Sequence, residues 1–118
     1  MNVPQIFESE YRFCEILWEN EPVSSTELVR LCSERLEWKK STTYTVIKRL
    51  AQRGVLKSED AMVTSLVSKA DVQSAESAKV VEKTFSGSLP DFIAAFTRKK
   101  DLSRQEIDEI QKIIDSYK

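Results

Sequence analysis

The sequence predicts a mainly α-helical protein that contains one small β-hairpin. Helix is favoured because the 118 residues include only 2 glycines and 3 prolines, so few positions must break a helix. Apolar residues recur at helical spacing through most of the chain, and β-favouring pieces appear only between residues 55 and 67. With 41% hydrophobic and 31% charged residues, the chain can bury one modest core, with or without an appended element.

Two short helices are predicted before residue 37. The first spans residues 8–19, and its inward-facing residues are Tyr11, Cys14, Leu17 and Trp18. The second opens with a capping box, in which Ser24 caps the backbone amide of Glu27 and the Glu27 carboxylate reaches back. Its inward-facing residues are Leu28, Leu31, Cys32 and Leu36.

A third helix is predicted from about residue 41 to residue 53. It ends at Gly54, because glycine commonly follows the last residue of a helix. On a helical wheel the inward residues are Thr43, Val46, Ile47 and Leu50. The outward residues are Ser41, Thr45, Lys48 and Gln52, flanked by Thr42, Tyr44 and Arg49.

A hairpin is predicted after the third helix. Residues 55–58 and 62–67 favour strands, and the polar pair Glu59-Asp60 separates them. Three short helices closed by a hairpin form a winged helix-turn-helix, which we assign to residues 1–70 as a DNA-binding domain. In that arrangement the third helix is the recognition helix.

Residues 71–118 predict further helices with apolar faces. One spans residues 71–85, the next begins at Ser88, and the last begins at a capping box formed by Ser103 and Glu106. Helices this short are marginal alone in water, and two-fold homodimers are the commonest oligomers, so we assign this region to dimerisation. The alternative is that these helices fold back on the winged domain and leave a monomer. The expected interface residues are Phe85, Leu89, Phe92, Ile93, Phe96, Ile107, Ile110, Ile113, Ile114 and Tyr117.

Composition argues against an enzyme. The chain has no histidine, which removes the usual general base and the commonest zinc ligand, and it has no glycine-rich phosphate loop. Its two cysteines, Cys14 and Cys32, fall on inward helical faces and are expected to be reduced core residues. We therefore predict no catalytic residue, no metal site and no cofactor. No apolar run is long enough for a membrane span and no signal peptide is visible, so a cytoplasmic location is expected.

The basic residues are concentrated where a nucleic-acid surface belongs. Residues 39–57 hold six bases and no acid, although the whole chain has 18 bases and 19 acids. Focused charge can attract phosphate even when the net charge is near zero. Hydroxyls at the start of the third helix suit base edges, and its later cations suit phosphate or guanine. The expected contacts with double-stranded DNA are Lys40, Ser41, Thr42, Tyr44, Thr45, Lys48, Arg49 and Arg53.

Two other interpretations of this segment remain open. Lysine and arginine are common on any exposed helix, so the run could be a solvated surface. The chain could also be a protein-interaction module that keeps a winged-helix scaffold, because its hairpin turn and overall balance are acidic.

The order of several short segments resembles one known family. The N-terminal segments are Glu10-Tyr11, Ile16-Leu17-Trp18, Val23-Ser24, Glu27-Leu28-Val29, Trp38, Thr42, Thr45, Arg49-Leu50 and Gly54-Val55-Leu56. The C-terminal segments are Gly87-Ser88, Phe92, Ala94-Ala95-Phe96, Leu102-Ser103 and Glu106-Ile107. Together they resemble the penicillinase repressor family (BlaI, MecI and CopY). The resemblance implies a homodimeric winged-helix repressor that binds a pseudo-palindromic operator, with Thr42, Thr45 and Arg49 as recognition-helix contacts.

Three features depart from that family. Its wing usually carries basic residues, tyrosine and a glycine turn, whereas this chain has the acidic segment 59–62. Antibiotic-responsive members are cut at an Asn-Phe bond, and Ala95-Phe96 occupies that place here. Copper-responsive members end in paired CxC motifs, and this chain has no cysteine after Cys32. The inducing protease or other signal is therefore left unidentified by the resemblance.

Overall fold

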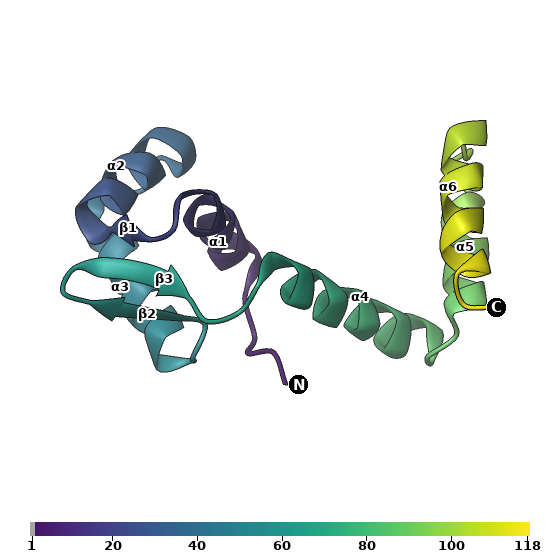
Figure 1. Ribbon diagram of the computed structural model, residues 1–118, viewed down its shortest axis with the longest axis horizontal. Coiled ribbons are helices and arrows are strands. Elements are labelled where there is room, and N and C mark those ends of the chain that lie inside the picture. Colours follow the sequence, from purple (N-terminus) through teal and green to yellow (C-terminus); the bar gives the residue numbers. More distant parts are fainter. Residues whose placement is uncertain (1) are drawn as a thin grey trace. The chain divides into compact units, whose positions relative to one another are not determined.

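The computed structural model describes residues 2–118, which form six helices and three strands (Figure 1). The elements in chain order are α1 (Glu8–Asn20), β1 (Val23–Ser24), α2 (Ser25–Leu36), α3 (Lys40–Gln52), β2 (Leu56–Glu59), β3 (Met62–Ser65), α4 (Lys69–Phe85), α5 (Leu89–Thr97) and α6 (Arg104–Asp115). The chain divides into two units, residues 1–76 and 77–118. This division falls within α4, six residues later than the boundary that the sequence suggested. The mainly helical winged-helix prediction is confirmed.

The first unit has one hydrophobic core, to which α1, α2, α3 and the sheet contribute. The predicted inward residues of α3, namely Thr43, Val46, Ile47 and Leu50, are all buried. The prediction for α1 was incomplete, because Phe13 and Ile16 are also buried, while Tyr11 and Trp18 pack at the edge of the core. The Phe13 ring stacks on Trp38 at a centroid distance of 6.1 Å. α1 therefore buries a broad face, wider than a single stripe.

The sheet has three strands in the order β1-β3-β2, so it is larger than the predicted hairpin. β1 pairs with β3 through Val23 and Val63. β1 was not predicted from the sequence, because a strand of two residues is too short to show periodicity. The hairpin turn is Asp60-Ala61, with φ of 52° and 63°. Glu59 lies in β2 and pairs with Met62. The predicted turn, Glu59-Asp60, was therefore one residue early.

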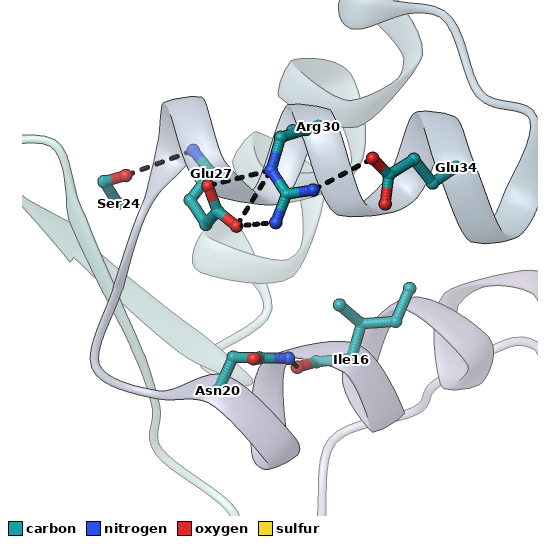
Figure 2. A network of polar contacts seen from close by, with 6 residues as sticks. All are labelled: Ile16, Asn20, Ser24, Glu27, Arg30 and Glu34. Atoms are coloured by element: carbon teal, nitrogen blue, oxygen red, sulfur yellow. Dashed lines mark hydrogen bonds and ion pairs between the residues drawn. The ribbon is translucent and has the colours of Figure 1, made fainter.

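The predicted capping box of α2 is half correct. The Ser24 Oγ accepts a hydrogen bond of 3.1 Å from the Glu27 N–H. The Glu27 carboxylate does not reach back, because it accepts from Arg30 Nε at 3.0 Å, and Arg30 also donates to Glu34 at 2.9 Å (Figure 2). A guanidinium one turn later offers two charge-assisted bonds, which is a stronger partner than one backbone amide.

The second unit contains the end of α4 with α5 and α6. The Ser88 Oγ caps α5 by accepting from the Asp91 N–H at 3.2 Å. Ser103 and Glu106 form the predicted capping box of α6, with reciprocal bonds of 3.1 and 3.0 Å. Within residues 2–118 no helix combines the length and apolar character that a bilayer span requires.

Candidate nucleic-acid interface

The α3 helix is presented by a short turn after α2. Glu37 adopts a left-handed conformation (φ 58°) at the end of α2, and Lys39 is extended immediately before α3. The Thr43 N–H closes the first turn of α3 by donating to the Lys39 carbonyl at 3.2 Å. α2, this turn and α3 form the helix-turn-helix of the winged fold.

The other end of α3 is closed by Gly54, as the sequence predicted. Gly54 has φ of 81°, a conformation that glycine adopts without a steric penalty. The Val55 N–H donates to the Leu50 carbonyl at 2.9 Å, and the Gly54 N–H donates to Ala51 at 3.2 Å. These are the two bonds of a Schellman motif. Backbone hydrogen bonds between nearby residues therefore close both ends of the helix.

The outward face of α3 collects most of the predicted DNA contacts. Lys40, Ser41, Thr42, Tyr44, Thr45, Lys48 and Arg49 are all exposed. Lys40 Nζ lies 5.9 Å from the centroid of the Tyr44 ring. Within residues 2–118, neither Lys48 nor Arg49 forms a salt bridge with an acid. This face combines hydroxyls, one phenol and uncompensated cations, which are the groups that contact bases and phosphates.

Arg53 lies elsewhere, in contacts internal to the domain. Its Nη1 donates to Glu10 Oε1 at 2.9 Å and to the Gln5 carbonyl at 2.8 Å, and its Nη2 pairs with the second Glu10 oxygen. The guanidinium also lies 5.3 Å from the centroid of the Phe7 ring. The structure thus separates Arg53 from the seven exposed residues with which the sequence grouped it.

Glu10 was missed by the sequence reasoning, although a signal for it was present. It lies one turn before Cys14 and two turns before Leu17, on the inward side of α1. A carboxylate at such a position requires a partner, because burial of an unpaired charge is costly. Burial raises the pKa of Glu10, but hydrogen bonds from Arg53 and the Phe7 N–H, with the charges of Arg53 and Arg49, outweigh it and lower this pKa overall.

The wing and the recognition helix differ in charge. Glu59 and Asp60 are exposed near the tip of the hairpin, and Lys57 is an exposed base in the same strand as Glu59. The acidic tip sets this wing apart from the acid-free α3.

Both cysteines are buried, as predicted, and burial raises the pKa of the Cys14 thiol to about 12.

The predicted dimer residues lie in the second unit, and none of them is buried. No residue of α5 or α6 is buried. Phe85 and Phe92 meet edge to face at 5.5 Å, and Phe92 and Ile110 line an apolar groove of about 280 Å³. The residues that remain exposed are Leu89, Ile93, Phe96, Ile107, Ile113, Ile114 and Tyr117. The unit therefore exposes many of the apolar side chains that a core would cover.

Comparison with known proteins gives a consistent result. The family model described as penicillinase repressor matches residues 6–116. The chain is 26% identical over 114 residues to the methicillin resistance regulatory protein MecI of Staphylococcus aureus (strain Mu50 / ATCC 700699), with 93% of each chain covered. It is 22% identical over 120 residues to the penicillinase repressor of Bacillus licheniformis, with 98% of this chain and 94% of that protein covered.

The winged helix and the cationic outward face of α3 define a DNA-binding transcription regulator. The family match extends over both units, so it includes the helical region as well as the winged domain. The chain belongs to the penicillinase repressor family. The resemblance predicted from the sequence is confirmed, and the named relatives are regulators rather than enzymes.

Proposed function

We propose that the protein is a homodimeric repressor that binds a pseudo-palindromic operator and blocks transcription. The observation that supports this proposal best is the outward face of α3, where seven exposed residues capable of DNA contact lie together without an acid. In a helix-turn-helix this helix enters the major groove. The penicillinase repressor named above supports the same class of activity here.

The proposed contacts divide by chemistry along α3. Ser41, Thr42 and Thr45 are short enough to approach base edges and thymine methyls. We infer that Lys40 and Tyr44 contact the phosphate backbone, together with the free amides at the start of the helix. Lys48 and Arg49 supply charge, and Arg49 can also bind guanine through two hydrogen bonds.

Dimerisation is proposed through the exposed apolar side chains of α5 and α6. A contiguous apolar patch on a soluble protein commonly marks an interaction surface. A second copy is the economical partner, because the same faces can meet around a two-fold axis. Each copy then places one α3 in one half-site, so half-sites about one helical turn apart, or a little more, are expected. The alternative, in which these helices fold back and leave a monomer, predicts weaker binding to one half-site.

Ala95-Phe96 stands where antibiotic-responsive members of the family have the Asn-Phe bond that is cut, so this position does not identify the signal that releases the repressor. A protease acting elsewhere, a small molecule or a partner protein would fill this role. A cytoplasmic location follows from the proposed activity.

A second candidate function is a protein-interaction module. It is favoured by one observation, the acidic tip of the wing at Glu59 and Asp60, which should repel phosphate. In that case α3 would bind DNA weakly and without sequence preference.

Fluorescence anisotropy at two salt concentrations separates the two functions. The protein should bind DNA from upstream of its own gene more tightly than scrambled DNA, and its affinity should fall steeply with salt, with a log-log slope of about -0.9 per neutralised phosphate. Equal, weak binding to both DNAs would favour the interaction module.

Two further measurements test the proposed contacts and the proposed dimer. Arg49→Ala should cost about 1 to 3 kcal/mol of operator binding. Sedimentation velocity should give a dimer, and a monomer would contradict the two-fold arrangement.

A further inference from the structure

The site concerned is the Glu10–Arg53 pair, between α1 and the C-terminal end of α3. Among residues 2–118, Glu10 is the only charged side chain that the core buries, with 5% of its surface exposed. Its carboxylate accepts from both terminal nitrogens of Arg53, and from the Phe7 N–H at 2.9 Å. A buried carboxylate is tolerated when its oxygens are paired and hydrogen-bonded in this way.

Arg53 is held on three sides. The Glu10 carboxylate binds one edge, the Gln5 carbonyl accepts a further bond, and the Phe7 ring lies against the guanidinium. Only 29% of the Arg53 side chain is exposed. A phosphate oxygen would have to displace these contacts in order to bind the same group. Arg53 is therefore poorly placed as a DNA contact, although it is part of the basic run in the sequence.

The pair acts on the end of the recognition helix. Arg53 is the C-cap residue of α3, directly before Gly54. Its side chain connects that end to α1 and to the segment before α1, which is fixed in turn by the buried side chain of Ile6. Direct readout of bases requires side chains held to within about 0.5 Å of a productive geometry, so a connection at the helix end affects contacts made along its face.

Arg49 lies one turn before Arg53 on the same helix. The charge of Arg49 contributes to lowering the pKa of Glu10, so the two groups interact electrostatically. If Arg53 were neutral, the Glu10 carboxylate would be left buried with Arg49 as the remaining neighbouring cation. It would then attract the group that we assign to guanine or phosphate.

We propose that Arg53 is a positioning residue, and that the Glu10–Arg53 pair fixes the C-terminal end of α3 and leaves Arg49 available for DNA. This inference rests on the proposed operator binding through α3. The inference predicts that neutralising Arg53 alone weakens operator binding, because Glu10 stays charged. Neutralising both residues should weaken operator binding less.

The test compares Arg53→Gln, Glu10→Gln and the double variant Glu10→Gln/Arg53→Gln in the full-length protein. Operator and scrambled-DNA affinities are measured by anisotropy over a salt series, below the unfolding temperature of each variant. We expect Arg53→Gln to weaken operator binding by roughly tenfold, within the usual range for an indirect effect of one group on a distant contact. The double variant should recover to within about threefold of the wild type, because the two substitutions are coupled. The salt slope of the double variant should match that of the wild type.

Arg53→Lys provides a variant that keeps Glu10 paired with a cation and so protects the fold. Lysine cannot reproduce the two-nitrogen geometry, so this variant should lose part of its preference for the operator over scrambled DNA. A phosphate contact predicts the reverse result, with near-normal binding by Arg53→Lys.

Two results would overturn the inference. Equal loss in Arg53→Gln and in the double variant, with a salt slope smaller by about 0.9, would make Arg53 a phosphate contact. Lower thermal stability with unchanged affinity and preference would make the pair part of the scaffold alone. If the wild type itself shows no preference for the operator, the proposed function fails. If the wild type prefers the operator but the double variant recovers no affinity, only the inference about Arg53 fails.

Discussion

The hairpin turn offers a direct test of the wing geometry through Ala61→Gly. Ala61 is exposed and has φ of 63°, in the left-handed region that alanine rarely adopts. That conformation costs an L-residue about 1 to 2 kcal/mol, and glycine avoids this cost. Glycine loses more backbone entropy on folding, which offsets about 0.5 to 1 kcal/mol of the gain. We therefore expect the free energy of unfolding to rise by about 0.5 to 1 kcal/mol.

Urea denaturation followed by tryptophan fluorescence measures this change. Trp18 and Trp38 both pack against the core of the first unit, so their emission reports its unfolding. Ala51→Gly is the matched control, because Ala51 is exposed within helix α3 and glycine there should lower stability by about 1 kcal/mol. A turn at Glu59-Asp60, as the sequence suggested, would place Ala61 in extended backbone. Destabilisation by Ala61→Gly would then follow and would refute the observed register.

The remaining predictions concern the buried acid, the apolar surface and the cysteines. Because the folded state lowers the pKa of Glu10, its contribution to stability is present above the unfolded value of about 4.3 and is lost as pH falls through the folded pKa. Glu10→Gln should therefore lower stability at pH 7 and converge with the wild type in acid; parallel curves in urea titrations would contradict this. Phe96→Glu should shift sedimentation from dimer to monomer, whereas Gln111→Glu on α6 should not, and a persistent Phe96→Glu dimer would place the interface elsewhere. Cys14 should resist iodoacetamide at pH 8 until urea unfolds the protein, because its thiol is buried and has a pKa of about 12; rapid alkylation of the native state would contradict its burial.

Local patterns predicted the helices of this protein well. The four buried residues of α3 follow the helical repeat, and Gly54 ends the helix through backbone conformation alone. The capping box at Ser103 was correct for the same reason, since both partners lie within one turn. These features depend on residues close together in the sequence.

Features that depend on distant residues were less accessible. β1 consists of two residues that form a strand only by pairing with β3, far along the chain. Arg53 could be identified as basic, but its partner Glu10 lies 43 residues earlier. A competing partner nearby was missed as well, because Arg30, three residues later, donates to the Glu27 carboxylate and so keeps it from reaching back toward Ser24. Periodicity does not encode such competition between partners.

The charge that the basic segment can offer to phosphate therefore depends on which of its bases are paired with acids, as well as on where those bases lie. Residues 39–57 hold six bases, and Arg53 among them is paired with a buried acid. By the inference above, that pairing brings no charge to the proposed DNA face but holds the end of the helix that carries Lys48 and Arg49. An acid-free run can thus contain two kinds of base, those that meet phosphate and those that hold the first kind in place. A buried acid on a neighbouring helix, as Glu10 is on α1, distinguishes the second kind from the first.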